Sequence, residues 1–284
     1  MGQMYMKSLL KGLLLFGISM GAAACFDPPE YAFTPEISFE NISFREAKAV
    51  GESDALVLTI SFKDGDGDLG LSTTAIDPPY HDVNFYLASG GKLIELKKRT
   101  VHSQLPQVVE VPPDVRGKLV TVRTPDDPLY SDLVPAYVDK HTSCTYYSYT
   151  TVFVSESDKH IFDKTYHYDS LVYTNLPKVY SVLDTFYYQK NPNYSNIDVE
   201  FWVEDGGEFK LFDWEKEFCT ISFNQRFMVL SDEERPVSGS LQYEMITSGM
   251  KTIFGVKPLK LKVRIRDRSL NNSNFIETPE FTLD

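Results

Sequence analysis

Alternation of apolar and polar residues is the feature that most restricts the fold of this chain. It is clearest over residues 56–62, 197–203 and 259–265, where every second side chain is aliphatic or aromatic and most of the others are polar. A period of two places successive side chains on opposite faces of an extended strand. These segments therefore predict strands of antiparallel sheets that are packed on one face and solvated on the other.

Turn signals separate the predicted strands and complete an all-β pattern. Gly90-Gly91 and Asp205-Gly206-Gly207 each divide two apolar segments in the way typical of β-hairpins. After residue 24, no long segment has the apolar stripe of an amphipathic helix. The pattern favours an all-β fold of the sandwich type, with one large or two tandem sandwiches, over alternating strands and helices.

The N-terminal segment predicts export and lipid attachment. Lys7 and Lys11 flank the start of a short apolar segment, and three alanines at 22–24 then lead to Cys25. This is the three-part pattern of a secretory signal, and its apolar segment is shorter than the ~20 residues that span a bilayer. The alanines and the cysteine resemble a lipobox, the cleavage site of lipoprotein signal peptidase, although most lipoboxes have leucine where this chain has Ala22. We expect removal of residues 1–24 and acylation of Cys25; an ordinary cleavage site before an incidental cysteine is the alternative.

Composition divides the rest of the chain. Prolines follow the predicted lipid site and indicate a stiff, extended tether. Eleven of the 17 tyrosines lie between residues 130 and 188, which sets this region apart as shorter strands and longer loops. The expected organisation begins with a lipoprotein signal peptide at 1–24 and a Pro-rich tether at 25–35. An N-terminal β-sandwich region at 36–130, a Tyr-rich insert or linker at 131–195 and a C-terminal β-sandwich region at 196–284 follow.

One segment carries the residue types of a metal site. Asp64, Asp66 and Asp68 alternate with glycines directly after a predicted strand. Carboxylates spaced in this way can turn several oxygens toward one hard cation such as Ca²⁺, although the spacing is not that of an EF-hand. Asp267 or Asn271 from the C-terminal turn would add a further oxygen. The alternative is that aspartate and glycine simply form a solvated turn. In both cases the role is structural, and we expect no cofactor beyond this structural Ca²⁺.

Two cysteines remain in the predicted mature chain. Cys144 and Cys219 are 75 residues apart, and an even number of cysteines outside the cytoplasm indicates a disulfide. Such a bond would close a long loop and contribute ~3–5 kcal/mol to stability in the chain-entropy model. Two separate buried thiols are the alternative.

Three segments resemble a known family. DGDGDLG at 64–70, FDWEKEFC at 212–219 and IRDRSLNNSNFIETPEF at 265–281 are similar to uncharacterised outer-membrane lipoproteins of Bacteroidota. The resemblance covers most of the mature chain and implies an immunoglobulin-like β fold, an outer-membrane location and often surface exposure, with the periplasmic face as the alternative. It also fits a bridge between Cys144 and Cys219, and it supplies no catalytic residues. The tripeptide around Ser170 resembles the O-glycosylation sequon of that phylum.

Several functions are disfavoured by the sequence. The formal net charge is −12, or −14 without the predicted signal, which argues against a nucleic-acid partner. Common motifs of serine hydrolases, zinc proteases and nucleotide-binding proteins are absent. Nothing in the sequence marks a glycosidase acid pair, and the five scattered histidines are expected at the surface. We therefore expect a non-enzymatic protein rather than a hydrolase.

Two non-enzymatic functions fit these features. The first is an accessory or interaction subunit, anchored in the outer membrane by its lipid, that docks on an outer-membrane β-barrel or other lipoproteins. Such complexes carry out nutrient uptake, protein secretion or barrel assembly. The second is a surface glycan-binding lipoprotein of a polysaccharide-utilisation system, which needs aromatic side chains in a groove. Exposure of Trp202 and Trp214 together on one face would favour it, and burial of both would weaken it. Tyrosines of the middle region suit either a binding surface or half-buried strands.

Overall fold

The structure is a computed structural model, and part of the chain is described. The described residues are 30–87, 92–115, 119, 152–158, 168–171, 175–182, 186, 188–218, 222–231, 233–247 and 249–283. They are mostly strands with very little helix, and their sheets are antiparallel, which confirms the predicted all-β class. None of their helices is long and apolar enough to cross a membrane. Ala32–Asp284 form one compact unit.

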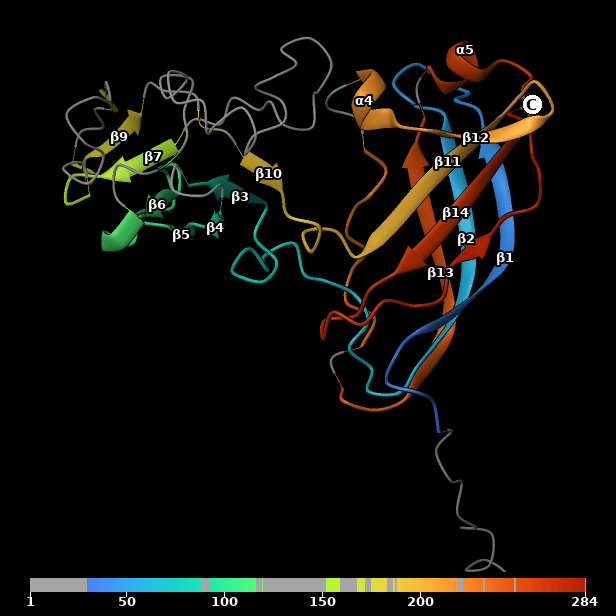
Figure 1. The fold of residues 1–284 in the computed structure, drawn as a ribbon, viewed down its shortest axis with the longest axis horizontal. Helices are drawn as coiled ribbons and strands as arrows, with labels where there is room; N and C mark the ends of the chain where they lie inside the picture. The colour runs from blue at the N-terminus through green and yellow to red at the C-terminus, as the bar shows by residue number, and fades with distance from the viewer. Residues whose placement is uncertain are drawn as a thin grey trace, which may run out of the picture. The chain divides into compact units, whose positions relative to one another are not determined.

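A three-stranded sheet joins strands from the two ends of the chain. Its order is β1 (Glu36–Arg45), β2 (Ala55–Asp64) and β13 (Val237–Ile246), with β2 in the centre (Figure 1). Leu56, Leu58 and Ile60 of β2 are fully buried, and the side chains between them are half-buried. The alternation in the sequence therefore corresponds to an inner and an outer face of this strand.

A four-stranded sheet has the order β12, β11, β14, β15. The same alternation is seen in β11 and β14, where every second residue is buried. β11 and β12 form the predicted hairpin, and both glycines of its turn have positive φ, +70° at Gly206 and +91° at Gly207, as a two-residue hairpin turn with matching twist requires. The strands are β11 (Ile197–Asp205), β12 (Glu208–Phe212), β14 (Leu259–Ile265) and β15 (Ile276–Glu277).

The two sheets share one hydrophobic core. Buried residues of β2 and β13 belong to the same cluster as those of β11 and β14. Aromatic rings from β12, from the short helix α4 (Trp214–Phe218) and from α5 (Met250–Phe254) close one end of this core. Residues that the sequence assigns to separate N-terminal and C-terminal regions thus pack together.

A second core is built from the middle of the chain. β3 pairs with β10 and β4, β5 pairs with β6, and β9 pairs with β7 and β8. Buried residues between Phe85 and Phe186 form its main cluster. The elements are β3 (Val83–Tyr86), β4 (Leu93–Glu95), β5 (Lys97–Arg99), β6 (Val108–Glu110), the 3₁₀ turn η1 (Pro113–Val115), β7 (Val152–Ser155), β8 (Tyr168–Leu171), β9 (Val179–Val182) and β10 (Tyr188–Lys190).

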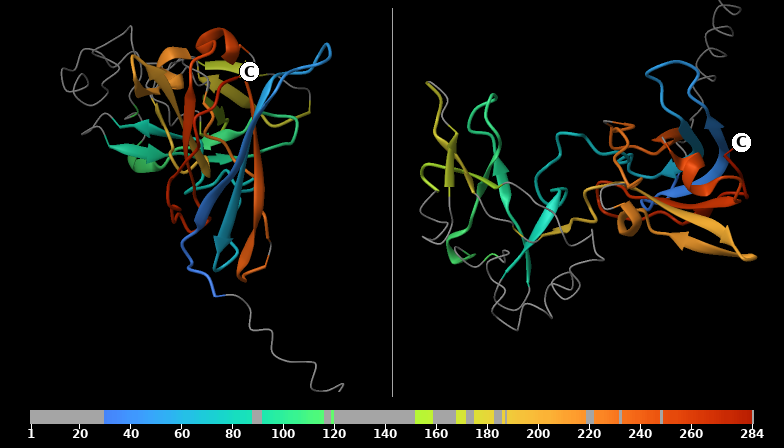
Figure 2. Two further views of the ribbon diagram at one scale, coloured as in Figure 1. Left: turned by 90° about the vertical axis from the view of Figure 1, so that its right-hand side faces the viewer. Right: turned by 90° about the horizontal axis from the view of Figure 1, so that it is seen from above.

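The three-stranded sheet has two distinct ends. Glu36, where β1 begins, is opposite Lys63 near the end of β2, and we call this the acid end. Ala55, where β2 begins, is opposite Ile246 at the end of β13, and α5 follows four residues later. We call this the α5 end. A ten-residue strand spans ~33 Å, so the two ends are well separated (Figures 1 and 2).

Candidate metal centre at the acid end

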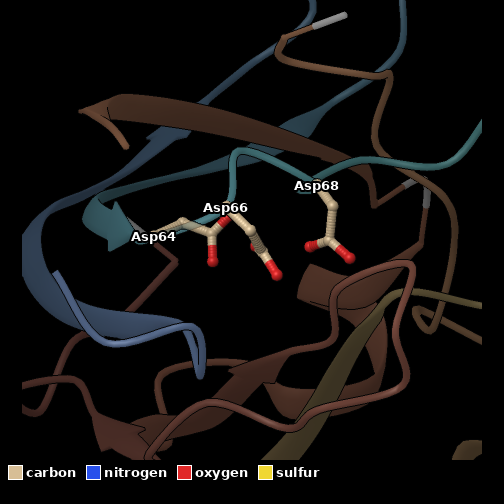
Figure 3. A group of neighbouring side chains, drawn as sticks. All are labelled: Asp64, Asp66 and Asp68. Carbon is tan, nitrogen blue, oxygen red and sulfur yellow. The ribbon is translucent and has the colours of Figure 1, made fainter. Parts of the chain in front are cut away.

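The three predicted carboxylates come together on one side of the loop that follows β2. Asp64 is the last residue of β2 and is 0 % exposed, and Asp66 and Asp68 follow it half-buried. One carboxylate oxygen from each lies within 4.8 Å of the others. Figure 3 shows the three side chains pointing to the same side of the backbone. The alternation of aspartate with glycine allows this because the glycines leave the loop free to turn tightly.

Two glycines of the loop pack directly against another segment. Gly67 and Gly70 have φ of +73° and +94°, a region that favours glycine. A Cβ at Gly67 would lie 2.6 Å from the carbonyl oxygen of Glu233, and one at Gly70 would meet the Met228 carbonyl oxygen even more closely. Backbone hydrogen bonds link the same segments, with the Leu71 N–H donating to the carbonyl of Phe227 at 2.9 Å. The loop is thus fixed on one side by residues 227–231 and 233–235.

The turn after β14 fixes the loop on its other side. The Asp68 carbonyl accepts a hydrogen bond from the Arg268 N–H at 3.1 Å. Oδ2 of Asp68 accepts from the N–H and the hydroxyl of Ser269, at 2.9 and 2.7 Å. Leu69 and Asp267 form an isolated antiparallel bridge. These contacts join the ends of β2 and β14, which belong to different sheets.

Asp267 and Asn271 form a second polar unit beside the carboxylates. Asp267 is 2 % exposed. Its Oδ1 accepts from the Asn271 N–H at 2.7 Å, and its Oδ2 accepts from Asn271 Nδ2 at 2.8 Å. The structure therefore brings both residues expected from the C-terminal turn to this end, with Asn271 orienting the Asp267 carboxylate.

Negative charge is concentrated here without compensation. Both oxygens of Asp64, Oδ1 of Asp66 and Oδ1 of Asp68 are buried and accept no hydrogen bond of ordinary geometry, although the nearby backbone N–H of Asp68 partly offsets the effect of burial on the pKa of Asp64. Burial, reinforced by the charges of Asp66, Asp68 and Asp267, raises the pKa of Asp64 from 3.8 to about 7. Burial also raises the pKa of Asp267, against the hydrogen bonds from Asn271. Such an arrangement can hold a hard cation, because all its potential ligand atoms are oxygens.

Other predicted site residues lie elsewhere or outside the described chain. Cys25, Cys144 and Cys219 are outside the described residues, so acylation and the disulfide stay predictions. Ser170 lies in β8, paired with Tyr180 of β9. Of the tyrosines considered for a binding surface, Tyr168 lies in β8. The others lie outside the described residues: Tyr130, Tyr137, Tyr146, Tyr147, Tyr149, Tyr166 and Tyr173.

The two tryptophans have different environments. Trp214 is 7 % exposed and packs edge-on against Phe201, with ring centroids 5.4 Å apart. Trp202 is half-buried and donates its indole N–H to Glu200 at 3.1 Å. They do not form the jointly exposed pair that would favour glycan binding.

The surface location expected for the histidines is wrong for His81. This side chain is buried, its Nε2 lies 2.8 Å from Asn84 Oδ1, and Asn191 Nδ2 lies 3.2 Å from its Nδ1. Polar partners on both ring nitrogens make burial of an imidazole favourable. Asn191 comes from a distant part of the chain, so local sequence gave no sign of this contact.

Sequence reasoning also missed residues that support the acid end. Ser269 was not predicted as the partner of Asp68. Arg226 donates to the carbonyls of Ser72, Ala75 and Tyr80 at 3.0, 2.7 and 2.6 Å and so holds the segment that follows the acid loop. Every residue has a backbone carbonyl, so the sequence does not show which carbonyls an arginine will bind. The role of Arg226 in holding this segment therefore could not be predicted.

Comparison with known proteins gives no further guide to the site. No protein-family model matches the chain, no curated protein matches it, and no solved structure matches it.

Substitution of the loop glycines should separate backbone strain from steric conflict. Gly70→Ala and Gly206→Ala both place a side chain at positive φ, which costs ~1–2 kcal/mol. Only at Gly70 does the new Cβ meet backbone atoms, since nothing lies within 4 Å of a Cβ at Gly206. We expect Gly70→Ala to lower the free energy of unfolding by ~2 kcal/mol more than Gly206→Ala. Equal losses in urea unfolding would contradict the close packing of the loop.

The acid end should make the metal-free protein less stable as the pH rises. The pKa of Asp64 is about 7 when folded and near 3.8 when unfolded, so folding favours its protonated form. The contribution of this group to the free energy of unfolding is fully present below pH 3.8 and is lost as the pH rises through about 7. In urea unfolding with a chelator, Asp64→Asn should flatten this decline, and the exposed control Asp205→Asn should not. An unchanged pH dependence in Asp64→Asn would show that Asp64 is not the group responsible.

Proposed function

We propose that the protein is a non-enzymatic, lipid-anchored outer-membrane lipoprotein that serves as an interaction subunit of an outer-membrane β-barrel complex. Cys25 carries the lipid, residues 26–35 form the tether, and the folded part faces the cell surface. The complex takes up nutrients, secretes proteins or assembles barrels. The folded part is an immunoglobulin-like β-sandwich, for which the shared core of two antiparallel sheets is the support.

The position of the first strand relative to the tether supports this proposal. The compact unit begins at Ala32, and β1 begins four residues later at the acid end. Along the chain, the proposed tether therefore leads into this sheet at its acid end. The α5 end lies at the opposite end of the strands.

Exposed apolar side chains at the α5 end are the observation that carries the proposal. Ile246 is 56 % exposed, Ile253 39 % and Val256 79 %, all within an 11-residue segment that ends β13 and contains α5. Exposed apolar side chains that follow one another closely along the sequence of a strongly acidic protein suit contact with another protein.

Attachment through Cys25 can be tested directly. We expect the full-length chain to incorporate labelled palmitate and to sediment with outer membranes, because acyl chains provide membrane affinity that an acidic surface does not. Cys25→Ser should lose both properties, whereas the matched control Cys144→Ser should keep the label. Label that persists in Cys25→Ser would sink the proposed anchor.

The partner can be tested by isolation of the tagged full-length protein from its own outer membranes in mild detergent, followed by mass spectrometry. We expect a stoichiometric barrel or further lipoproteins. The triple variant Ile246→Ser, Ile253→Ser, Val256→Ser should recover ~tenfold less partner, since a combined loss of about 1.4 kcal/mol from the three contact residues weakens binding tenfold. Met228→Ser, another exposed apolar residue but not at the α5 end, is the control.

Failure of this experiment has a clear meaning. A wild-type protein that purifies alone even after cross-linking is not an interaction subunit, and binding to glycan arrays then becomes the measurement of choice. Equal partner recovery from wild type and the triple variant, with unchanged melting temperatures, would place the contact away from the α5 end.

A further inference from the structure

The carboxylates of the acid end have a charge that the described protein does not neutralise. Asp64 is fully buried, and neither of its oxygens accepts a hydrogen bond of ordinary geometry; the nearby backbone N–H of Asp68 offsets only part of the effect of burial on its pKa. The charges acting on it, from Asp66, Asp68 and Asp267, are all negative. No lysine, arginine or histidine in the described part of the chain forms an ion pair with any of these four residues. Buried carboxylates without a partner are unfavourable unless a cation binds them or a proton neutralises them.

The three carboxylates each bring one oxygen close to the others. Oδ2 of Asp68 is held by Ser269, and its buried Oδ1 has no hydrogen-bond partner. The Asp68 side chain lies on the same side of the loop as those of Asp64 and Asp66 (Figure 3). Separations within 4.8 Å suit oxygens around one Ca²⁺, because two ligands at ~2.4 Å from an ion are at most ~4.8 Å apart. Mg²⁺ usually keeps several of its waters and is bound by one or two carboxylates, so a group of three carboxylates favours Ca²⁺.

We infer that Asp64, Asp66 and Asp68 bind one Ca²⁺ ion at the end of β2. Asp64 supplies the most buried ligand, and Asp66 and Asp68 supply one oxygen each. Asp267, oriented by Asn271, adds negative charge beside the ion. Solvent or backbone oxygens complete the six to eight ligands that Ca²⁺ takes.

The ion has a structural consequence beyond its own loop. Asp64 ends the central strand of one sheet, whereas Ser269 and Asp267, which contact the acid loop, follow β14 of the other sheet. Calcium therefore strengthens a junction between the two sheets at the end nearest the tether. A site made by one short loop has modest affinity, in the range of ~10⁻⁴–10⁻³ M found in extracellular modules.

Calorimetric titration of the full-length protein in detergent, after removal of metal with a chelator, tests this inference. We expect one Ca²⁺ per chain and a rise in melting temperature with calcium concentration, because a ligand that binds the folded state stabilises it. Equal concentrations of Mg²⁺ should produce a much smaller rise. No heat and no rise in melting temperature at ~10 mM Ca²⁺ would overturn the site, and an equal response to Mg²⁺ would overturn its assignment to calcium.

Variants make the test independent of folding defects. Asp64→Asn removes the buried charge, so its metal-free form should melt at a higher temperature than the wild type while calcium affinity falls at least tenfold, corresponding to 1.4 kcal/mol. Asp205→Asn makes the same chemical change at the exposed turn between β11 and β12 and should bind like the wild type. Calcium affinity that is equal in Asp64→Asn and wild type would overturn the inference, as would equal loss in both variants.

Discussion

The pairing of β2 with β13 is the interaction on which the rest of the structure depends. It joins Asp64 to Val237, 173 residues away in the sequence, and it completes the inner face of the three-stranded sheet. It also brings residues 227–231 and 233–235 against the loop that follows β2, where Gly67 and Gly70 leave room for them. Without this register, the carboxylates would lie on an ordinary solvated turn. The candidate metal centre is thus a consequence of long-range sheet pairing rather than of the DGDGDLG sequence alone.

Local features of the fold could be predicted because they depend on side-chain alternation. The segments 56–62, 197–203 and 259–265 became strands with every second residue buried, and Asp205-Gly206-Gly207 became the turn of a hairpin. Strand pairing could not be predicted in the same way, because hydrogen bonds between backbones are the same for every sequence. Hence β10 pairs with β3 across about 100 residues, a partnership that no composition boundary indicates.

In the candidate site, too, the local features could be predicted from the sequence and the long-range contacts could not. The three aspartates and the two residues of the C-terminal turn were identifiable because oxygen-rich side chains are spaced at intervals suited to a cation. What the sequence could not provide was burial. A carboxylate at position 64 could equally lie in water, and only the packing of two sheets around it removes its solvent and raises its pKa to about 7. Supporting contacts from Ser269 and Arg226 depend on that packing as well.

The placement of β1 has a mechanical consequence. A force applied to the chain before Glu36, against a support at the α5 end, would pull β1 lengthwise from its N-terminus at the acid end. In this geometry the force runs along the strands, so the hydrogen bonds between β1 and β2, from Glu36–Lys63 to Arg45–Ala55, share it simultaneously. A strand peeled from its other end would instead break them one after another. The sheet would therefore resist such a force in shear, and the loop of the three carboxylates lies at the end where that force would enter the fold.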